Sequence, residues 1–368
     1  MPNNSSRRQW LKNSTAALAG VSLAPAIFAT ERERYREAGI ILLNGNENAY
    51  GPSTAARKAM TEAAGNSNRY PDDRVSVLKK QVAGFWNVGM ENILFGAGSS
   101  EFLGLVSLLV SVKKAKIITA EPSYRVWNGQ AESFGLGFKR IPVANDKTLD
   151  LAAMMPAISD DTTMVYICNP NNPVGTYVED GLLRNFVIDC SKKCMVLIDE
   201  AYTEFADVPS LKDLAVKDPN IVVAKTFSKI YGLAGARIGY VIAHPSTIKM
   251  LARFQPWPDA NISAVTVAAA SAALKDQAFV KDCKEKIAQS RELCYKTFKE
   301  LSLEYIPSHT NFILFNIGKI GPDFSQKMQA KNIFVQYRDH FGGKWCRVSM
   351  GTIDEMNTFC SALKSIAG

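Results

Sequence analysis

The sequence predicts an α/β protein whose large domain holds a mostly parallel sheet between helices and whose smaller C-terminal domain is α+β. Two observations support this fold class. Short apolar runs bounded by turn residues alternate with helical patterns, which is typical of parallel strands buried on both faces. Two prolines within residues 255–262 then break the alternation, and a helix-rich stretch with further strands follows.

The composition excludes several kinds of protein. The chain has 368 residues, of which 47% are hydrophobic and 21% charged, as in ordinary globular proteins of two or three domains. Only 3 histidines occur, far apart, so we expect no metal centre and no histidine-based triad. The net charge is +8, but the basic residues are spread along the chain. We therefore expect no nucleic-acid partner, and a site for anionic ligands instead.

The first residues resemble a twin-arginine export signal. Arg7 and Arg8 lie ahead of an apolar stretch from Ala16 to Ala29, which is too short to span a bilayer comfortably. We expect the signal over residues 1–29, a periplasmic or secreted mature protein and no membrane span in the mature chain. The alternative is a frayed amphipathic helix on a cytoplasmic protein.

The remaining elements follow in chain order. A helix is expected over 74–86, where Val75, Leu78 and Val82 share one face. The large domain should then contain a strand at 92–95, a Gly-rich turn at 96–100, a helix at 101–110, and strands at 115–119, 163–168, 195–199 and 221–224. Beyond the break we expect helices within 263–301, strands near 311–315 and 346–350, and a final helix from about Asp354. The corresponding domains are an N-terminal arm over 30–65, a large domain over 66–255 and a small domain over 256–368.

Seven cysteines are present, and none forms a CxxC pair, so neither a zinc site nor a redox motif is expected. Most of them should be buried as small hydrophobic residues. An oxidising compartment would allow one disulfide.

The sharpest motif is TFSKIYGLAGARIGY at 226–240, directly after an expected strand. Lys229 taken alone would be a surface lysine. Thr226, Ser228 and Arg237 accompany it and supply two hydroxyl groups and a guanidinium, which suit a phosphate group. A lysine beside a bound phosphate can form a Schiff base with the aldehyde of pyridoxal phosphate.

Two further motifs end expected strands. In VLIDEAYTEFA (196–206), Asp199 lies at the carboxyl end of the strand, where open α/β sheets bind ligands. Asp199 could pair with a pyridine nitrogen and Tyr202 could donate to a phenolate oxygen, although a helix cap is the alternative for Asp199. In CNPNNPVGTY (168–177), Asn172 could donate to the same oxygen, or the segment is only a turn.

Two motifs are weaker. GAGSSEFLGL (96–105) leads into a helix whose free N–H groups suit a phosphate, but it is neither a Walker loop nor a dinucleotide fingerprint. EPSYRVW (121–127) follows a strand, and its Tyr124 could stack on a planar ring or belong to the core.

The order of these motifs resembles fold type I pyridoxal-phosphate enzymes, and most closely the histidinol-phosphate aminotransferase family. LNGNENAYGPS (43–53) and NRYPD (68–72) are similar to elements of that family, and HTNF and RVSMGT follow in the family order. The resemblance covers about residues 40–362. It implies a homodimeric aminotransferase that uses pyridoxal 5'-phosphate to move an amino group from an amino acid to an oxo acid. The alternatives are histidinol-phosphate transamination itself, a decarboxylase or lyase of the same fold, and a non-catalytic exported binding protein.

The resemblance also implies a role for each motif residue. Lys229 would hold the cofactor and move the proton, Asp199 would keep the pyridine nitrogen protonated, and Tyr124 would stack on the ring. Asn172 and Tyr202 would bond the phenolate oxygen. The cofactor phosphate would be held by Ser99, Ser100, Thr226, Ser228, Arg237 and, from the neighbouring subunit, Tyr70. The substrate would be bound by Arg347, Tyr50 and Asn311.

One departure from the family bears on the substrate. Gln336 stands where the family commonly carries an arginine that helps bind the substrate phosphate, although Arg338 lies close by in the sequence. Arg347, between apolar residues, needs an anionic partner, which is either an internal acidic residue or the substrate's carboxylate or phosphate. We therefore expect ordinary α-amino acids, aromatic or aliphatic, to outcompete histidinol phosphate as amino donors.

Overall fold

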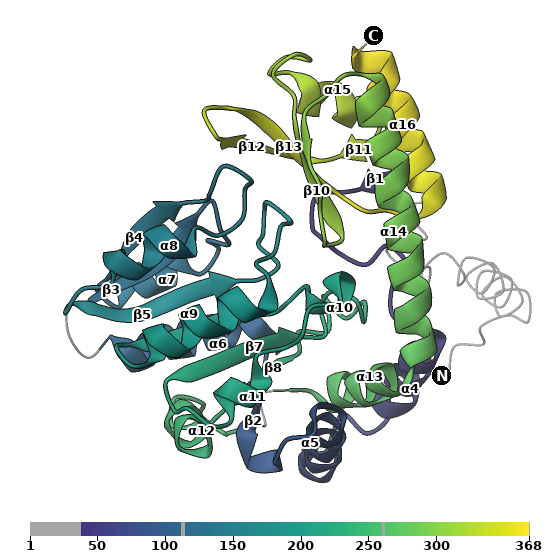
Figure 1. The fold of residues 1–368 in the computed structure, drawn as a ribbon. Helices are drawn as coiled ribbons and strands as arrows, with labels where there is room; N and C mark the ends of the chain where they lie inside the picture. The colour runs from purple at the N-terminus through teal and green to yellow at the C-terminus, as the bar shows by residue number, and fades with distance from the viewer. Residues whose placement is uncertain (1–37, 112–114, 260–261, 368) are drawn as a thin grey trace, which may run out of the picture.

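The computed structural model describes residues 38–111, 115–259 and 262–367. The export signal expected over residues 1–29 lies outside these ranges. The described chain forms two units, a large one around a seven-stranded sheet and a smaller one, at the C-terminal end, around a four-stranded sheet (Figure 1). The predicted α/β class, with a smaller α+β unit, is confirmed.

The strands of the large sheet are β2 (Ile93–Gly96), β3 (Ala115–Glu121), β4 (Leu136–Pro142), β5 (Thr162–Cys168), β6 (Met195–Asp199), β7 (Ile221–Thr226) and β8 (Gly239–Ala243). Their spatial order is β2-β8-β7-β6-β5-β3-β4. Strands β4, β3, β5, β6 and β7 pair in parallel, whereas β8 runs antiparallel to both β7 and β2. The carboxyl ends of β5, β6 and β7 therefore lie at the same edge of the sheet. The motifs identified in the sequence follow these strands and lie at that edge.

Helices cover both faces of this sheet. Because successive residues of a strand point to opposite faces, each strand contributes side chains to a buried cluster on either side. Leu197 and Val222 belong to one buried cluster and their neighbours Ile198 and Val223 to the other. The first cluster includes residues of α6 (Ser99–Val110), α7 (Asn128–Ser133) and α12 (Pro245–Ala252). The second includes residues of α5 (Asp72–Trp86), α8 (Leu151–Met154), α9 (Asp180–Ser191) and α11 (Lys212–Ala215), and it continues into the small unit.

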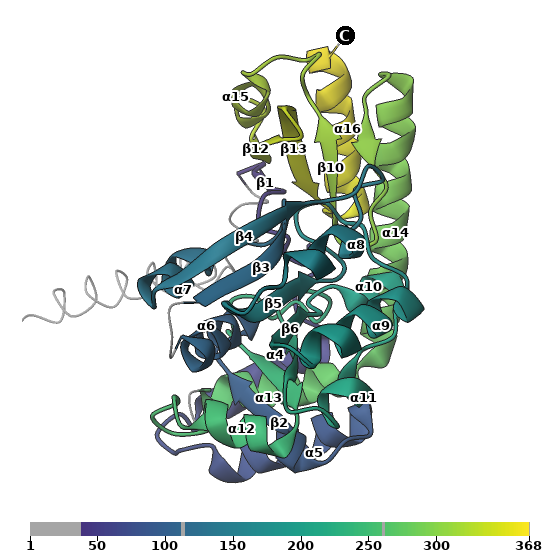
Figure 2. The ribbon, with the colours of Figure 1, turned by 60° about the vertical axis from the view of Figure 1, so that its left-hand side comes forward.

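The small unit is built on an antiparallel sheet in the order β12-β13-β10-β9. These strands are β9 (Tyr305–Ile306), β10 (Phe312–Asn316), β12 (Gln336–His340) and β13 (Gly343–Ser349). Two long helices, α14 (Gln277–Glu300) and α16 (Ile353–Ala367), lie side by side along it (Figure 2), and α15 (Phe324–Gln329) completes the unit. The short strand β1 (Ile41–Leu42) pairs with β11 (Ile333–Phe334), which joins the start of the described chain to the small unit.

The remaining elements are α4 (Thr54–Ala64), η1 (Met90–Asn92), η2 (Met155–Ala157), α10 (Thr203–Ala206) and α13 (Ala264–Lys275). Helix α13 follows the break at 255–262, yet it packs against α4 and α5 beside the large unit. Helix α14 then runs from there into the small unit (Figure 1). The elements expected from the sequence are present with ends shifted by a few residues, but the strands β1, β4, β8, β9, β11 and β12 were not foreseen.

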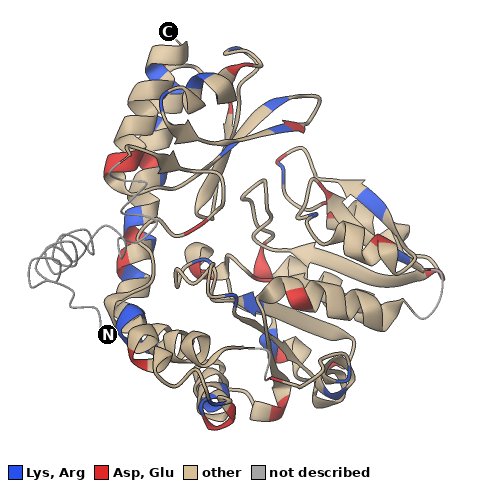
Figure 3. Ribbon diagram, turned by 180° about the vertical axis from the view of Figure 1, so that it is seen from behind, with Lys and Arg blue, Asp and Glu red and all other residues tan. Residues whose placement is uncertain are grey.

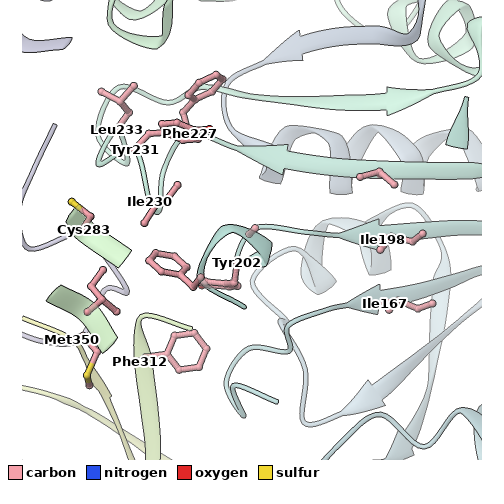
Figure 4. Packing of buried hydrophobic residues seen from close by; sticks show 14 of the residues in the cluster. Ile167, Ile198, Tyr202, Phe227, Ile230, Tyr231, Leu233, Cys283, Phe312 and Met350 are labelled. Carbon is pink, nitrogen blue, oxygen red and sulfur yellow. The ribbon is translucent and has the colours of Figure 1, made fainter. Parts of the chain in front are cut away.

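A continuous apolar core extends from the large unit into the small unit. The ring of Tyr202 packs edge-on against Phe312 of β10, with centroids 5.3 Å apart, and Ile230 and Met350 lie close by (Figure 4). All seven cysteines are buried, and among the described residues none is in a disulfide. Basic and acidic residues are interspersed over both units (Figure 3). None of the described helices combines the length and apolar character that crossing a bilayer requires.

Candidate active site

A cavity of about 830 Å³ lies where the carboxyl ends of the parallel strands face the small unit. Its walls come from the strand ends, the start of α6, residues 44–47, and strands β12 and β13. Eleven residues predicted from the motifs line it together: Ser99, Ser100, Tyr124, Asn172, Asp199, Tyr202, Thr226, Ser228, Lys229, Arg237 and Arg347. Residues far apart in sequence thus converge on one site.

Lys229 extends into this cavity from the turn after β7. Phe227 and Ile230, its neighbours on that turn, are buried and anchor the backbone on either side. The Lys229 Nζ donates to the carbonyl oxygen of Asn46 at 3.2 Å. Burial, together with the positive charge of Arg347, lowers the pKa of Lys229 to about 8. Roughly a tenth of the amine is then unprotonated at pH 7, far more than for an ordinary lysine, so Lys229 is a competent nucleophile.

Asp199 ends β6 at the floor of the cavity and is almost fully buried. Its carboxylate accepts hydrogen bonds from the Tyr166 hydroxyl and from the Ala201 N–H, each at 3.1 Å. Burial raises the pKa of Asp199 to about 6 in spite of these donors. A buried carboxylate of this kind is stabilised by a cationic partner, such as a protonated ring nitrogen.

Tyr202 and Asn172 form a hydrogen-bonded group above Asp199. The Tyr202 hydroxyl accepts from the side-chain amides of Asn172 and Asn46, each at 3.2 Å. The other end of the Asn172 amide accepts from Arg347 Nη1 at 2.8 Å. Burial raises the pKa of Tyr202, so its hydroxyl keeps its proton and can donate to an anionic oxygen.

The opposite end of the cavity suits a phosphate dianion. Helix α6 begins at Ser99, so Ser99 and Ser100 lie in its first turn with the free N–H groups and the positive end of the helix dipole. The Thr226 hydroxyl donates to Ser228 Oγ at 2.9 Å, and both side chains line the same end as Arg237. Gly98 has a φ of +89°, and a Cβ there would lie 2.4 Å from Arg237 Nη2. The arginine therefore occupies space that only glycine leaves free.

Arg347 lies on β13 directly opposite Gln336 of β12 and is only 8% exposed. Its Nη1 and Nη2 donate to the Asn172 side chain and to the Asn44 carbonyl, whereas its buried Nε has no partner among the described residues. Burial lowers the pKa of Arg347 to about 10. Its partners are neutral oxygens rather than a carboxylate, so the guanidinium is available to an anionic ligand.

Three residues predicted for the site do not line this cavity. Asn311 is buried, and its Nδ2 donates to the carbonyl oxygens of Asn46 and Glu47 at 3.0 and 3.2 Å, so its side chain positions the segment that forms one wall of the cavity. Tyr50 lies against Lys286, whose Nζ is 5.1 Å from the ring centre. Tyr70 is 76% exposed and outside the cavity of its own chain. Neither Tyr50 nor Asn311 lines the cavity of its own chain, and their contact with a substrate stays a prediction.

The comparisons with known proteins agree with this geometry. The family model described as aminotransferase class I and II matches residues 38–363. The chain belongs to this family. A histidinol-phosphate aminotransferase of Moorella thermoacetica is 34% identical over 91% of this chain and 88% of its own length. Its counterpart in Caldicellulosiruptor saccharolyticus is 36% identical over 89% of this chain and 92% of its own.

A solved structure shows the same fold. Histidinol-phosphate aminotransferase of Sinorhizobium meliloti, in complex with pyridoxal-5'-phosphate, superposes with a TM-score of 0.84 at 29% identity. The match covers 92% of this chain and 95% of that one. This chain is thus a transaminase that depends on pyridoxal phosphate and transfers an amino group from an amino acid to an oxo acid.

The residues of the aminotransferase fit that cofactor. When bound, pyridoxal phosphate supplies an electron-accepting ring that stabilises a carbanion next to the amino group. Lys229 would offer the amine for its aldehyde, and Asp199 would offer the buried carboxylate for its ring nitrogen. Tyr202 and Asn172 offer donors for its phenolate oxygen, and the hydroxyls and Arg237 at the start of α6 suit its phosphate.

Several residues of the aminotransferase site were not foreseen. Asn46, at a φ of +53°, bonds Tyr202 through its side chain and Lys229 through its carbonyl. It belongs to the LNGNENAYGPS segment, but nothing in that segment points to these partners. Tyr166 gave no signal because it lies within an apolar strand. Arg125, after β3, and Arg338 of β12 also line the cavity, and of these two only Arg338 was apparent from the sequence, through its nearness to Gln336.

Proposed function

We propose that this aminotransferase prefers donors that carry an α-carboxylate over histidinol phosphate, the compound for which its relatives are named. The observation that supports this proposal most directly is that Arg347 of β13 lies opposite Gln336 of β12. One guanidinium with free donors matches the two oxygens of a carboxylate. A phosphate dianion bound at the same position would lie next to the neutral amide of Gln336. A second cation in place of that amide would stabilise the dianion more.

The test compares kcat/KM for several L-amino acids and for histidinol phosphate, with a single oxo acid as acceptor. Wild type should favour amino acids. Arg347→Lys should lose at least tenfold in kcat/KM for amino acids, because an ammonium cannot reproduce the bidentate contact. Gln336→Arg should shift preference toward histidinol phosphate. A wild-type enzyme that prefers histidinol phosphate by tenfold or more would overturn the proposal.

We also propose that the enzyme is a homodimer in which Tyr70 reaches the partner's cofactor phosphate. Tyr70 is exposed and packs on Trp257, itself 47% exposed, with ring centres 5.0 Å apart. Two large aromatic side chains left on the surface suit an interface.

We propose finally that the protein is exported through a twin-arginine route. The support is the order of Arg7, Arg8 and the apolar stretch in the first 29 residues. Fractionation of cells expressing the full chain should find the protein outside the cytoplasm, and Arg7→Lys with Arg8→Lys should retain it. Equal distribution of the wild type and this variant would contradict export.

A further inference from the structure

Lys225 is a buried lysine that lies next to the active site without lining its cavity. It belongs to β7, directly before Thr226, and is only 1% exposed. Because successive strand residues point to opposite faces, Thr226 lines the cavity while Lys225 points to the face that α5 covers. Its Nζ lies 4.7 Å from the centre of the Trp86 ring at the end of α5. An ammonium buried in this way needs partners for its three donors.

The polar partners of Lys225 all lie in the turn after β6 and at the start of α10. Its Nζ donates to Thr203 Oγ1 at 2.5 Å and pairs with Glu204 Oε1 at 2.9 Å. The carbonyl oxygen and the carboxylate of Glu200 are each 3.5 Å away. Burial opposes the charge of Lys225, but the two carboxylates outweigh it and raise its pKa, so the side chain is a cation. The ammonium therefore holds residues on both sides of Tyr202.

The backbone of this turn is held only partly by its own hydrogen bonds. At its start, the Glu200 N–H donates to the carbonyl oxygen of Ala224 at 3.0 Å. Further on, the Thr203 N–H is 3.4 Å from the carbonyl oxygen of Glu200, which is long for a hydrogen bond. Helix α10 has four residues, too few to be stable without tertiary contacts. The part that carries Tyr202 therefore depends on side-chain contacts, and Lys225 supplies two charged ones.

Tyr202 connects this turn to the active site. Its backbone belongs to the turn, whereas its hydroxyl lies 3.2 Å from each of the side-chain amides of Asn46 and Asn172. A backbone shift of about 0.5 Å away from these amides would take both contacts beyond hydrogen-bonding range. The position of the hydroxyl is thus sensitive to whatever holds the turn.

We propose that Lys225 is a positioning residue of the active site, whose buried ammonium holds the turn so that the Tyr202 hydroxyl is presented to the cofactor's phenolate oxygen. The alternative is that Lys225 only neutralises Glu200 and Glu204 and affects stability alone. The bound cofactor distinguishes the two. A hydroxyl that donates to the phenolate oxygen favours its deprotonated form, so loss of that donor raises the pH at which the bound cofactor titrates. This titration requires no amino donor, so its result is independent of the donor preference proposed above.

The first experiment titrates the visible absorbance of the cofactor in the holoenzyme against pH. In Lys225→Met, the midpoint should rise by about one pH unit or more relative to wild type. Arg184→Met is the matched control. Arg184 of α9 also pairs with two carboxylates, those of Asp180 and Asp213, each at 2.8 Å, and it does not line the cavity. The control should keep the wild-type midpoint even though it loses ion pairs. A wild-type midpoint in Lys225→Met would overturn the proposal.

A double variant assigns the effect to Tyr202. Tyr202→Phe removes the hydroxyl and should raise the midpoint by itself. If Lys225 acts through that hydroxyl, adding Lys225→Met to Tyr202→Phe should raise the midpoint no further. A rise equal to the sum of the two single rises would show that Lys225 acts on the cofactor by another route, and the proposal would be wrong. An unchanged midpoint in Tyr202→Phe would overturn it as well.

A milder variant keeps the test decisive if Lys225→Met does not fold, since that change leaves two carboxylates without their cation. Glu204→Gln removes one charged contact of Lys225 at a side chain that is 16% exposed. It should raise the midpoint in the same direction by a smaller amount. In the cofactor-free protein, amide hydrogen exchange of residues 200–204 should be roughly threefold faster or more in Glu204→Gln and unchanged in Arg184→Met. Wild-type exchange or a wild-type midpoint in Glu204→Gln would contradict the proposal.

Discussion

At the residue scale, the site is governed by two buried groups whose ionisation is shifted in opposite directions. Burial raises the pKa of Asp199 to about 6 and lowers that of Lys229 to about 8, so each charged form is destabilised in the folded protein. These shifts bring both groups within reach of physiological pH. A cofactor that pairs with the carboxylate and bonds the amine relieves both penalties.

Replacing Lys229 with alanine should abolish covalent attachment of the cofactor, because only a primary amine can bond its aldehyde. The variant should lose the visible absorbance of the lysine-bound cofactor and all but a trace of turnover. Lys249→Ala, at an exposed position of α12, serves as the control. Full turnover by Lys229→Ala would show that another amine bonds the cofactor aldehyde.

Replacing Asp199 with asparagine should cut turnover by orders of magnitude while the cofactor remains bound. A neutral amide cannot hold the ring nitrogen protonated, so the carbanion loses its stabilisation. Steady-state rates and cofactor content, measured on the same preparation, check this. Near-normal transamination would refute the role of Asp199.

The same substitution should stabilise the cofactor-free protein, with a defined pH dependence. Asp199 stays protonated up to about pH 6 in the folded state, whereas the unfolded chain ionises from about pH 4. Wild type therefore loses stability as the pH rises from 4 to 6, and the loss persists above that range. Asp199→Asn cannot ionise, so it should be more stable than wild type by on the order of 2–3 kcal/mol at pH 8 and nearly equal at pH 4.

Urea unfolding of the cofactor-free forms at the two pH values measures this difference. Asp160→Asn, which changes an exposed carboxylate, is the matched control and should show no such pH dependence. A gain of stability at pH 4 as large as that at pH 8 would disprove the ionisation argument.

At the element scale, the phosphate end depends on how closely the turn before α6 approaches the turn after β7. Gly98 has a φ of +89°, and Arg237 Nη2 occupies the place of its missing side chain. Gly239 is equally confined, since a Cβ there would lie 2.4 Å from the Ser99 backbone nitrogen. Two glycines thus allow two loops to meet around one anion.

Gly98→Ala should weaken cofactor binding at least tenfold, because the new methyl group displaces Arg237 and strains the backbone. Gly129→Ala is the control, because a Cβ there would have no described atom within 4 Å and its φ is ordinary. Titration of the cofactor-free variants with pyridoxal phosphate measures the effect. Unchanged affinity in Gly98→Ala would separate the turn from phosphate binding.

At the scale of the whole molecule, the proposed dimer makes each site depend on two chains. Tyr70→Ala should weaken cofactor retention about tenfold, since one phosphate contact is lost. When the Tyr70→Ala and Lys229→Ala chains are mixed and exchanged, one site per heterodimer should hold both native residues. That site combines Lys229 from one chain with Tyr70 from the other.

Activity regained at limiting cofactor, beyond the sum of the two separate variants, measures this complementation. Sedimentation of the wild type down to nanomolar concentration gives the oligomeric state directly. A fully active monomer, or no complementation despite proven exchange of chains, would rule out a shared site.

The sequence by itself determined the strands of the large sheet other than β4 and β8, and most of the residues that line the cavity at their ends. The reason is that these signals are local. An apolar run that ends in Asp199, or a lysine with two hydroxyl residues beside it, places its chemistry at a strand end wherever the strand lies in the sheet. The parallel order then brings these ends together.

The tertiary structure alone decided what each distant residue does. The sequence predicts that Asn311 lines the substrate pocket, and only the structure shows that its side-chain amide donates to the backbone carbonyls of Asn46 and Glu47. Gln336 indicates a loss of positive charge, yet the alternation along β12 aims Arg338 at the same cavity, where Arg125 meets it from the other unit. Which side chains share a cavity depends on strand register and on how two units pack, and neither quantity is encoded within a short stretch of sequence.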